Sequence, residues 1–474
     1  MSAEAVPVER RSDLIERIVS LSKQRGFVYP SSEIYGGLNA VYDFGPLGTR
    51  LRRNIRNRWW RRMVDLRDDV EGIESSILMN PRVWEASGHV QSFTDPLVDC
   101  MGPCKRRWRE DHLPAEREAR GKSADAPGCP ECDGTLTPAR QFNLMFKTFI
   151  GPVADDAAQI WLRPETAQGM FVDFTNVVNS TRRRLPFGIA QQGKAFRNEI
   201  SPGNFIFRLR EFELMEMEFF CKPGTDLEWH EYWCNERFSW HVDDMGVRKA
   251  NLRLRPHEKD ELSHYSTATS DIEYAFPFGW GELEGIADRT DYDLKRHMEF
   301  SGRDLSYFDT QTNERYIPYV IEPALGLDRT MITLLVDAYD EEEVRGEKRT
   351  VLRFHPDVAP VQVAVLPLSK KAELVDPARK LEHDLRGHFA TEYDETQSIG
   401  RRYRRQDEIG TPLAVTFDFD SLEDHAVTIR ERDGMTQVRV ATDRLADALR
   451  DELQVSRDRA SARARGGLER APKA

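Results

Sequence analysis

Hydrophobic and polar residues recur with different periods along this chain, and the changes of period divide it into segments. Apolar positions between residues 13 and 24 have helical spacing, and residues 50–64 repeat that pattern, so both stretches are predicted helices. Residues 141–340 carry mostly strand-like patterns. From about residue 360 the periods alternate, which predicts strands at 361–368, near 391, at 412–420 and at 425–432, with helices from 369 and at 400–409. This alternation indicates a separate α/β domain.

The most informative segment is residues 196–220, which the pattern predicts to be a β-hairpin. Ser201-Pro202-Gly203-Asn204 is a turn signature between two apolar runs. Because side chains alternate between the two faces of a strand, one face of the second strand is expected to carry Ile206, Arg208, Arg210, Phe212, Leu214, Glu216 and Glu218. Burying these charges without partners would be costly. A polyanionic ligand that carries a flat base would pair with the arginines and stack on the aromatic ring, and an ammonium group would pair with a carboxylate. The alternative is a solvated face on which arginines and glutamates pair with one another.

Length and composition restrict the classes of function. A chain of 474 residues is expected to form two or three domains, and 39% hydrophobic residues suffice for large cores. No run of 18 apolar residues is present, so no membrane partner is expected. The net charge of −12 argues against a protein that coats nucleic acid indiscriminately, although local basic patches would still contact phosphates. Six cysteines fit a reducing compartment, so we expect a cytoplasmic protein.

Four of the cysteines form two close pairs in a polar stretch. Cys100 and Cys104 are separated by three residues, and Cys129 and Cys132 by two. Four thiolates spaced in this way suit a tetrahedral zinc ion. The pattern predicts a structural zinc site in an insertion at residues 100–140, with four reduced thiols in a loop as the alternative.

Several motifs carry a resemblance to a known family. The predicted hairpin resembles the second signature motif of class II aminoacyl-tRNA synthetases, with Phe196-Arg197-Asn198-Glu199 closing its first strand. Residues 162–168 (LRPETAQ) precede it, and residues 321–329 (IEPALGLDR) follow as the third motif. Residues 32–38, 42–48 and 398–410 are similar to segments specific to the dimeric type of glycyl-tRNA synthetase. The resemblance runs in order from about residue 10 to about residue 450.

The resemblance implies an α+β fold with a class II antiparallel sheet flanked by helices. The expected division is a catalytic domain at residues 1–340 that contains the cysteine-bearing insertion, a charged linker at 341–356 and an α/β anticodon-binding domain at 357–456. Residues 457–474 are basic and poor in apolar residues, so a disordered tail is expected there. A symmetric homodimer is also implied, with Pro81-Arg82-Val83-Trp84 near its interface.

The implied activity is the ATP-dependent attachment of glycine to tRNA(Gly) through a glycyl-adenylate. Arg197 would bind the α-phosphate and the substrate carboxylate, and Arg208 the terminal phosphates. Phe212 would lie under the adenine ring, Arg329 over its other face, and Glu199 would accept from its amino group. Arg197, Glu216 and Arg329 are the predicted catalytic residues. The full set expected at ATP is Arg197, Asn198, Glu199, Phe207, Arg208, Leu209, Arg210, Glu211, Phe212, Glu282, Leu283, Gly326, Leu327, Asp328 and Arg329.

Carboxylates are expected around the glycine ammonium and around a magnesium ion. Glu165, Glu216 and Glu322 match family acids that surround the amino group, and Ala324 stands where the family often has Ser. The full set expected at glycine is Arg109, Glu165, Phe212, Glu213, Leu214, Met215, Glu216, Glu322, Pro323, Ala324, Leu325 and Gly326. Glu282 and Glu284 are two residues apart in a predicted strand, which would place both on one face, with Mg²⁺ held there by Glu282.

Two basic clusters, Arg182–Arg184 and Arg401–Arg405, are the densest in the chain. Runs of charge usually form a solvated surface. The second cluster gains weight as a tRNA contact because it lies in the predicted anticodon-binding domain and contains Tyr403, an aromatic ring that could stack on a base. Two alternatives to the synthetase remain: a catalytically silent synthetase-like regulator that binds tRNA, and an acyl-adenylate ligase for a free carrier, which would not need the C-terminal domain.

Overall fold

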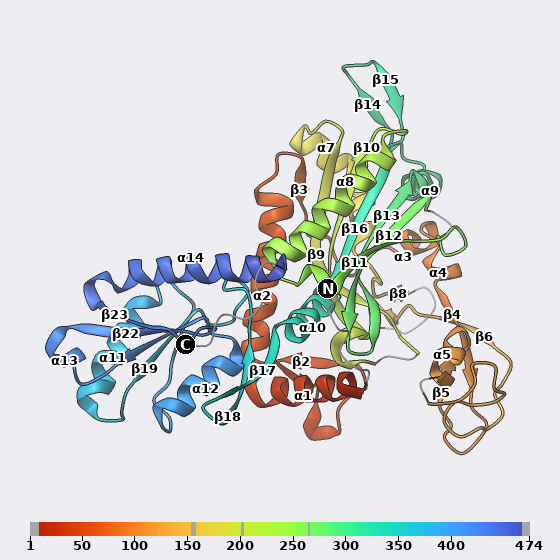
Figure 1. Ribbon diagram of the computed structural model, residues 1–474. Coiled ribbons are helices and arrows are strands. Elements are labelled where there is room, and N and C mark those ends of the chain that lie inside the picture. The colour runs from red at the N-terminus through yellow and green to blue at the C-terminus, as the bar shows by residue number, and fades with distance from the viewer. Residues whose placement is uncertain (1–8, 119, 153–157, 201–202, 264–265, 467–474) are drawn as a thin grey trace.

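A computed structural model describes residues 9–118, 120–152, 158–200, 203–263 and 266–466, and a seven-stranded sheet forms its centre (Figure 1). The strand order is β11-β12-β13-β16-β10-β9-β3, with every neighbouring pair antiparallel except β3 and β9. The strands are β3 (Val70–Gly72), β9 (Phe187–Phe196), β10 (Glu211–Cys221), β11 (Leu252–Pro256), β12 (Ala268–Phe276), β13 (Gly279–Thr290) and β16 (Tyr319–Gly326).

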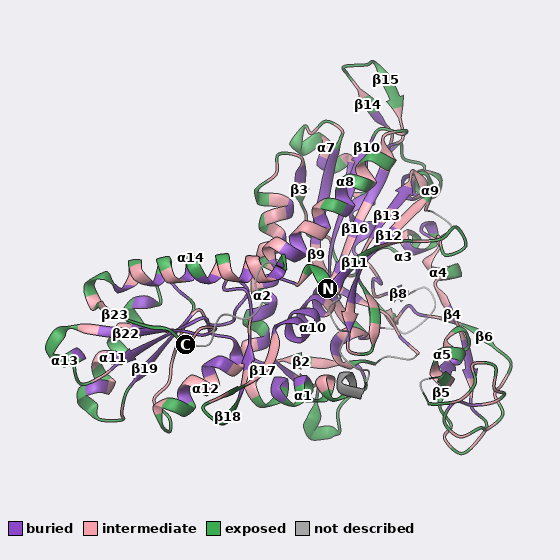
Figure 2. Ribbon diagram, in the orientation of Figure 1, coloured by how far each residue is buried: buried purple, intermediate pink, exposed green. Residues whose placement is uncertain are grey.

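Helices cover both faces of this sheet. One face packs on α1 (Glu9–Arg25), α2 (Pro46–Trp60), α8 (Asp226–Ser239) and α10 (Leu327–Ala338), with fully buried Met215, Met217 and Phe219 of β10 between them. Part of the other face packs on α6 (Ala167–Val172), α7 (Phe174–Thr181) and α9 (Tyr292–Ser301), where Phe220 is buried. Strand β10 is therefore buried on both faces along most of its length (Figure 2).

Smaller elements surround the central sheet. Three strands, β4 (Thr94–Asp99), β5 (Arg107–Arg109) and β6 (Arg140–Asn143), form a sheet with α5 (Leu113–Glu118) at the edge of the molecule, and the two cysteine pairs lie there. The other elements of this half are β1 (Val28–Pro30) with β2 (Tyr42–Phe44), β7 (Lys147–Phe149) with β8 (Gln159–Trp161), β14 (Tyr307–Asp309) with β15 (Glu314–Tyr316), α3 (Pro81–Ala86) and α4 (His89–Ser92).

The C-terminal part has its own sheet and its own core. The strand order is β20-β19-β21-β22-β23, with the first three strands parallel and the last two antiparallel. Its elements are β19 (Val363–Pro367), α11 (Ala372–Leu385), β20 (Thr391–Tyr393), α12 (Ile399–Ile409), β21 (Leu413–Phe417), α13 (Ser421–Asp424), β22 (Ala426–Glu431), β23 (Gln437–Ala441) and α14 (Leu445–Ala464). In Figure 1, this blue lobe lies beside the central sheet, and α14 reaches from one to the other.

The structure confirms the helices predicted at residues 13–24, 50–64 and 400–409. It also confirms the strands predicted between residues 361 and 432. Residues 341–356 are more ordered than a linker, because β17 (Tyr339–Val344) and β18 (Glu347–Leu352) pair as a hairpin.

The predicted disordered tail is wrong for residues 457–464, which complete α14. Arg457 pairs with Asp357 at 2.8 Å, and the buried Ala464 packs on the main core, so this segment is held by neighbouring acids and apolar surface. Residues 467–474 lie outside the described residues.

The predicted hairpin at 196–220 is wrong in its second strand. Strand β9 ends at Phe196 and β10 begins only at Glu211, while residues 205–207 form a short 3₁₀ turn. The alternation expected between residues 206 and 210 therefore does not apply. Ser201 and Pro202 of the predicted turn lie outside the described residues.

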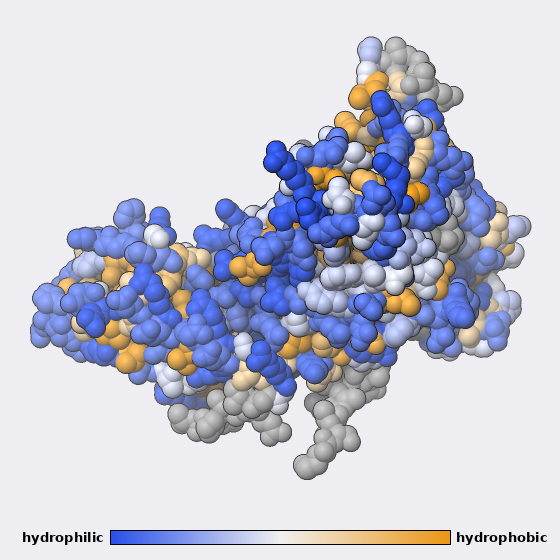
Figure 3. Space-filling model, turned by 90° about the horizontal axis from the view of Figure 1, so that it is seen from above, coloured by the Kyte–Doolittle hydropathy of each residue, from blue (hydrophilic) through white to orange (hydrophobic). Residues whose placement is uncertain are grey.

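No described helix combines the length and apolar character that crossing a membrane requires. On the face of the molecule in Figure 3, hydrophilic residues predominate and hydrophobic ones are scattered in small groups. Ion pairs join the two halves of the chain: Arg58 of α2 contacts Asp357 at 2.6 Å, and Arg465 contacts Asp243 at 2.8 Å.

The most buried of these polar joints is Arg349 in β18. Its side chain is fully buried, its Nε donates to Asp407 of α12 at 2.8 Å, and its Nη2 donates to the Arg432 carbonyl at 2.5 Å. Arg349→Leu is expected to lower the free energy of unfolding by about 3 kcal/mol, because buried Asp407 then keeps only Arg430 as its partner among the described residues and the Arg432 carbonyl loses this donor. Urea unfolding of the full chain measures this. Arg401→Leu is the control, since Arg401 is exposed on α12, and it is expected to change the value by less than about 0.5 kcal/mol. An equal, small effect of both substitutions would contradict the structural role of Arg349.

Candidate active site

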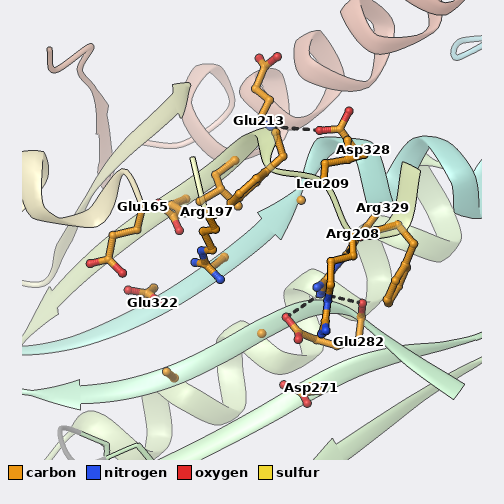
Figure 4. Close-up of a pocket in the computed structure, with 18 of the residues that line it drawn as sticks. Glu165, Arg197, Arg208, Leu209, Glu213, Asp271, Glu282, Glu322, Asp328 and Arg329 are labelled. Carbon is orange, nitrogen blue, oxygen red and sulfur yellow. Dashed lines mark hydrogen bonds and ion pairs between the residues drawn. The ribbon is translucent and has the colours of Figure 1, made fainter. Parts of the chain in front are cut away.

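A cavity of about 400 Å³ opens over the middle of the central sheet. Its floor consists of β10, β12, β13 and β16, and the segment between β9 and β10 forms one wall (Figure 4). The residues predicted from sequence that line it are Glu165, Arg197, Glu199, Phe207, Arg208, Leu209, Phe212, Glu213, Leu214, Glu216, Glu282, Glu322, Ala324, Gly326, Asp328 and Arg329. The sheet thus brings together residues from four distant parts of the chain.

One end of the cavity is acidic. Glu165 and Glu322 lie close together in Figure 4, and Glu216 lines the same end. Glu216 accepts from the backbone N–H of Thr166 at 2.7 Å and from its hydroxyl group. Although burial opposes its ionisation, the charges of His89 and Arg289 lower the pKa of Glu165 well below its usual range. Burial, with Glu216 and Glu165 nearby, raises the pKa of Glu322 to about 8 against the opposing effect of Arg289.

Arg289 organises this acidic end, and the sequence reasoning missed it. Its guanidinium group donates to Asp293 at 2.8 and 2.9 Å and to Glu322 at 2.6 Å, while its side chain is only 3% exposed. Gln168 bridges the same group, since its Nε2 donates to Asp293 at 2.8 Å and to Glu165 at 3.0 Å. The sequence held no signal for Arg289: it lies seven residues after Glu282, so strict alternation would place it on the opposite face of β13, and only the bulge brings it to the cavity.

The other end of the cavity is basic. Arg208 and Arg329 lie together beside Glu282, whereas Arg197, the residue after β9, points into the middle of the cavity (Figure 4). The Nε of Arg197 donates to the Pro164 carbonyl at 3.1 Å, and its guanidinium carbon lies 5.4 Å from the ring centroid of Phe212. Arg329 contacts Glu282 at 3.1 Å and lies 4.7 Å from the ring centroid of Phe207. The ring beneath Arg329 is therefore Phe207, whereas Phe212, predicted to lie on the opposite side of adenine from Arg329, lies beside Arg197.

A β-bulge overturns the prediction that Glu282 and Glu284 share a face. In the pairing with β12, Ile272 faces Glu284 and Glu273 faces Glu282, so Leu283 is an extra residue. The residues of β13 that line the cavity are Glu282, Gly285, Ala287 and Arg289. Glu284 faces away, fully buried between Arg237 at 2.6 Å and His241 at 2.7 Å.

Asp271 of β12 takes the place predicted for Glu284 as the second carboxylate near Glu282. Both residues line the cavity from neighbouring strands. Arg329 lowers the pKa of Glu282, whereas burial and the nearby Glu282 raise the pKa of Asp271. Two carboxylates from adjacent strands are an oxygen ligand set that fits Mg²⁺.

Helix α2 supports the basic end from behind. The Nη2 of Arg52 donates to Glu213 at 2.9 Å, its Nη1 pairs with Asp328, and its guanidinium carbon lies 3.8 Å from the ring centroid of Phe44. Asp328 in turn accepts from the backbone N–H of Glu213 at 3.1 Å. Buried Arg52 therefore connects the segment at 42–48, through Phe44, to the second motif at Glu213 and to the third motif at Asp328.

The remaining predicted residues do not line the cavity. Met215, Leu283, Leu325 and Leu327 are buried in the hydrophobic core. Arg109 pairs with Asp95 at 2.9 Å and Asp111 at 2.6 Å, and Glu211 is exposed beside Lys194. Arg210 donates to the carbonyls of Asn39 and Glu199. Asn198 and Pro323 also lie outside the lining. For Met215, Leu283 and Leu325 the cause is that strand residues on the core face are adjacent in sequence to those on the cavity face.

The four cysteines converge as predicted. Their Sγ atoms all lie within 4.8 Å of one another, with Cys100–Cys132, Cys104–Cys129 and Cys104–Cys132 at 3.4, 3.5 and 3.3 Å. Zinc–sulfur bonds of about 2.3 Å would place tetrahedral sulfurs about 3.8 Å apart. Gly102 and Gly134 pack so closely that a Cβ on Gly134 would come within 2.6 Å of the Gly102 Cα. The two turns are thus pressed together in a way that suits a shared ion.

The cluster Arg401–Arg405 is mostly built into the C-terminal fold. Arg402 is 1% exposed and donates to the carbonyls of Pro367, Glu395 and Gln397. Tyr403 is hydrogen-bonded to Thr416. Its ring therefore supports α12, and the sequence reasoning overestimated this cluster as a nucleic-acid surface.

Comparison with known proteins follows the two halves of the chain. The family model described as "tRNA synthetase class II core domain (G, H, P, S and T)" matches residues 148–338. The model described as "Anticodon binding domain" matches residues 362–452.

Whole-chain relatives agree with these matches. The chain is 58% identical to glycine–tRNA ligase of Acetivibrio thermocellus, over 91% of this chain and 96% of that protein. It is 54% identical to glycine–tRNA ligase of Thermobifida fusca, over 94% of this chain and 99% of that protein. Among solved structures, prolyl-tRNA synthetase of Giardia lamblia in complex with prolyl-adenylate matches with a TM-score of 0.69 at 13% identity, covering 96% of this chain and 82% of that one, which shows a shared fold. The chain belongs to the glycine–tRNA ligases, a family of class II aminoacyl-tRNA synthetases.

Proposed function

We propose that this chain attaches glycine to tRNA(Gly) in the cytoplasm, first forming glycyl-adenylate from glycine and ATP and then transferring the glycyl group to the terminal ribose. The observation that carries the proposal is the division of one cavity into an acidic end and a basic end. Glu165, Glu216 and Glu322 would take the ammonium, and Arg208 and Arg329 the phosphates. Residues 1–340 would perform the chemistry and residues 357–456 would bind the anticodon.

In the first step, a glycine carboxylate oxygen attacks the α-phosphorus of ATP, a new P–O bond forms, and pyrophosphate leaves with the electrons of the bond that breaks. Arg197 would hold the carboxylate and the α-phosphate, because it lies between the two ends of the cavity. Its contacts with Pro164 and Phe212 restrain the guanidinium group before the substrates arrive, which favours stabilisation of the charge that develops. In the second step, a ribose hydroxyl attacks the glycyl carbonyl and AMP leaves.

Magnesium would be held by Glu282 and Asp271, whose carboxylates come from adjacent strands. When bound, the ion would neutralise charge on the ATP phosphates. Arg329 keeps Glu282 ionised, so this carboxylate can also position the arginine over the nucleotide. Stacking of adenine between Phe212 and Arg329 stays a prediction, and the contact between Arg329 and Phe207 would have to open for it.

Glycine offers only an ammonium and a carboxylate for recognition. At the acidic end, Ala324 lies between Glu216 of β10 and Gly285 of β13 in the sheet. No hydroxyl group is available at position 324, so the three carboxylates would supply the specificity for the ammonium. Larger amino acids would be excluded by steric closure, since an added methyl group clashes in a filled pocket.

The alternative of a catalytically silent regulator has no support in the comparisons, and Arg197, Arg208 and Arg329 all line the cavity. We also propose that two chains form a symmetric dimer, as the family resemblance implies, with the segment Pro81–Trp84 near the interface.

Glycine-dependent ATP–pyrophosphate exchange and charging of tRNA(Gly) test the proposed function. Arg197→Ala is expected to lower kcat for exchange by about 10²–10³-fold, because the lost donor acts mainly on the transition state. Circular dichroism should show an unchanged fold. Arg315→Ala, an exposed arginine in β15, is the matched control and should retain full exchange. Exchange by Arg197→Ala within a few-fold of the wild type would remove Arg197 from its proposed role.

We further propose that the cysteine cluster holds one structural zinc ion. The Sγ separations and the packing of Gly102 against Gly134 support it. Cys132 would ionise readily, because the backbone N–H groups of Cys104 and Gly134 lower its pKa to about 6. The ion would brace the three-stranded sheet, which has only a small core of its own.

Elemental analysis of the purified chain is expected to find about one zinc ion per chain. The double variant Cys104→Ser/Cys132→Ser should lose it, and hydrogen exchange should accelerate between residues 94 and 143. Cys234→Ser is the control, since Cys234 is a buried cysteine of the main core and should leave the zinc content unchanged. A wild-type chain without bound zinc, prepared without chelators, would refute the proposal.

We also propose that the tRNA backbone contacts a basic groove between the two halves of the chain. The groove has a volume of about 880 Å³, and its lining includes Arg50 and Arg53 of α2, Arg379 of α11 and Arg386, which follows α11. Arg50 and Arg53 are exposed and make no hydrogen bond or ion pair with any described residue. Unpaired guanidinium groups facing a groove suit phosphodiester oxygens.

The double variant Arg50→Glu/Arg53→Glu is expected to weaken tRNA binding and to flatten its dependence on salt. Two lost phosphate contacts would reduce the slope of log K against log [salt] by about 1.4–1.8. Exchange should be unaffected because both residues lie outside the catalytic cavity. Filter binding over a range of KCl concentrations measures this. The control Arg182→Glu/Arg184→Glu reverses the same number of exposed charges elsewhere. Equal losses in both double variants would indicate a nonspecific charge effect and contradict the groove.

A further inference from the structure

Glu218 is a buried carboxylate that the proposed chemistry does not use. It lies on β10 two residues after Glu216, and its side chain is fully buried. In the antiparallel register, Glu216 faces Ala324 and Phe219 faces Ile321 on β16. Glu218 therefore stands directly across from Glu322, and side chains in such positions share one face with Cβ atoms about 4.5–5.5 Å apart.

Both carboxylate oxygens of Glu218 lack a hydrogen-bond partner among the described residues. Burying an ionised carboxylate in this way is costly, and a neighbouring carboxylate adds repulsion. Burial, then the charge of Glu322, raises the pKa of Glu218 well above its usual range.

The surroundings of Glu218 contain too few cations. The carboxylates that face it are Glu216 on the same strand, Glu322 on β16 and Asp293 on α9, with Glu165 beyond them. Arg289 of β13 is the guanidinium group among them, and it already donates to Asp293 and Glu322. Arg197 faces Glu216 from the cavity, and His89 of α4 contacts Glu165 at 3.2 Å. Buried Arg163 also faces Glu216. Even with Arg289, Arg197, Arg163 and a charged His89, five carboxylates would exceed the positive charge.

We propose that Glu218 is a positioning and specificity residue of the glycine site: with Glu322 it shares one proton while the site is empty, and the pair releases that proton to solvent when the ammonium of glycine enters. The inference rests on the proposed function, since it assigns glycine to the acidic end. No bond other than O–H is broken, and the ammonium replaces the charge of the departing proton. Glu218 does not line the cavity, so it acts through Glu322.

The proposal gives glycine binding a definite dependence on pH. Below the pKa of the pair, each bound glycine displaces about one proton, so the affinity rises about tenfold for each unit of pH. The rise ends where the pair is already ionised in the empty site, which lies above neutral pH because burial raises the pKa of both carboxyls, that of Glu322 to about 8. The acidic end thereby favours a ligand with a cationic group over a neutral ligand of equal size, because only the cation is attracted by the ionised pair.

Calorimetric titration of the full chain with glycine, in buffers of different ionisation enthalpy at pH 7, counts the protons released. About one proton per glycine is expected. In parallel, KM for glycine in pyrophosphate exchange, at saturating ATP and Mg²⁺, should fall about tenfold between pH 6 and 7 and level off above pH 8.5.

Glu218→Gln separates this role from a purely structural one. The amide has nearly the same shape but no charge, so the repulsion across the pair is lost and Glu322 would ionise at a lower pH beside Arg289 in the empty site. Glycine binding should then release fewer protons than in the wild type, and KM should fall less steeply between pH 6 and 7, with kcat near that of the wild type. Glu218→Asp keeps the charge and should keep the wild-type pH dependence. Glu314→Gln, an exposed glutamate of β15, is the control and should behave as wild type.

Two results would overturn the inference: a wild-type chain that binds glycine without releasing a proton, or a Glu218→Gln variant that keeps the full pH dependence. The wild-type proton count decides the matter even if the variant fails to fold. Failure of the proposed function itself would look different, because glycine-dependent exchange would then be absent at every pH.

Discussion

An excess of buried carboxylates over cations, at the centre of a sheet, determines how this molecule is organised. Glu165, Glu216, Glu322 and Asp293 gather around Arg289, which is 3% exposed. A core tolerates buried charges only where they are paired. The family to which the chain belongs explains why this arrangement persists: the missing positive charge is one that the substrate can bring. Thr166, just before α6, donates to Glu216, and Arg289 donates to Glu322 and to Asp293 of α9, which keeps these acids in place meanwhile.

The basic end of the cavity is constructed in the opposite way. Its arginines make few bonds to side chains: Arg197 uses a carbonyl and two rings, and Arg329 uses Glu282 and backbone oxygens. Their positions come from the backbone segments that carry them, which Arg52 fixes from behind through Asp328 and Glu213. Guanidinium groups held in this way remain available to an anion. The acidic end therefore lacks a cation and the basic end lacks an anion. An amino acid brings the ammonium group and a polyphosphate brings the negative charge.

Sequence reasoning located most of the cavity because the signature motifs are local. Runs such as 321–329 fix their own strand and the start of a helix, so Glu322 and Arg329 could be assigned from the chain alone. Arg289 could not be, because its role depends on acids contributed by three other elements. The face of Glu284 was predicted wrongly because one extra residue in a strand reverses the alternation, and a bulge has no sequence signal as clear as a turn. Tyr403 and Arg402 were misjudged for a related reason: charge density in a sequence does not distinguish a guanidinium group that binds carbonyls inside its own domain from one that faces solvent.

The bulge in β13 also explains how one strand can serve both the core and the cavity. Without the extra residue, Glu282 and Glu284 would both face the cavity, and Arg237 would be buried without its carboxylate. With it, Glu284 pairs with Arg237 and contacts His241 on the helical side, while Glu282 stays beside Arg329. The same shift places Gly285, Ala287 and Arg289 on the cavity side. A single inserted residue thus allows a buried ion pair under α8 and a substrate cavity to lie on opposite faces of one strand, and the charge balance on each face depends on it.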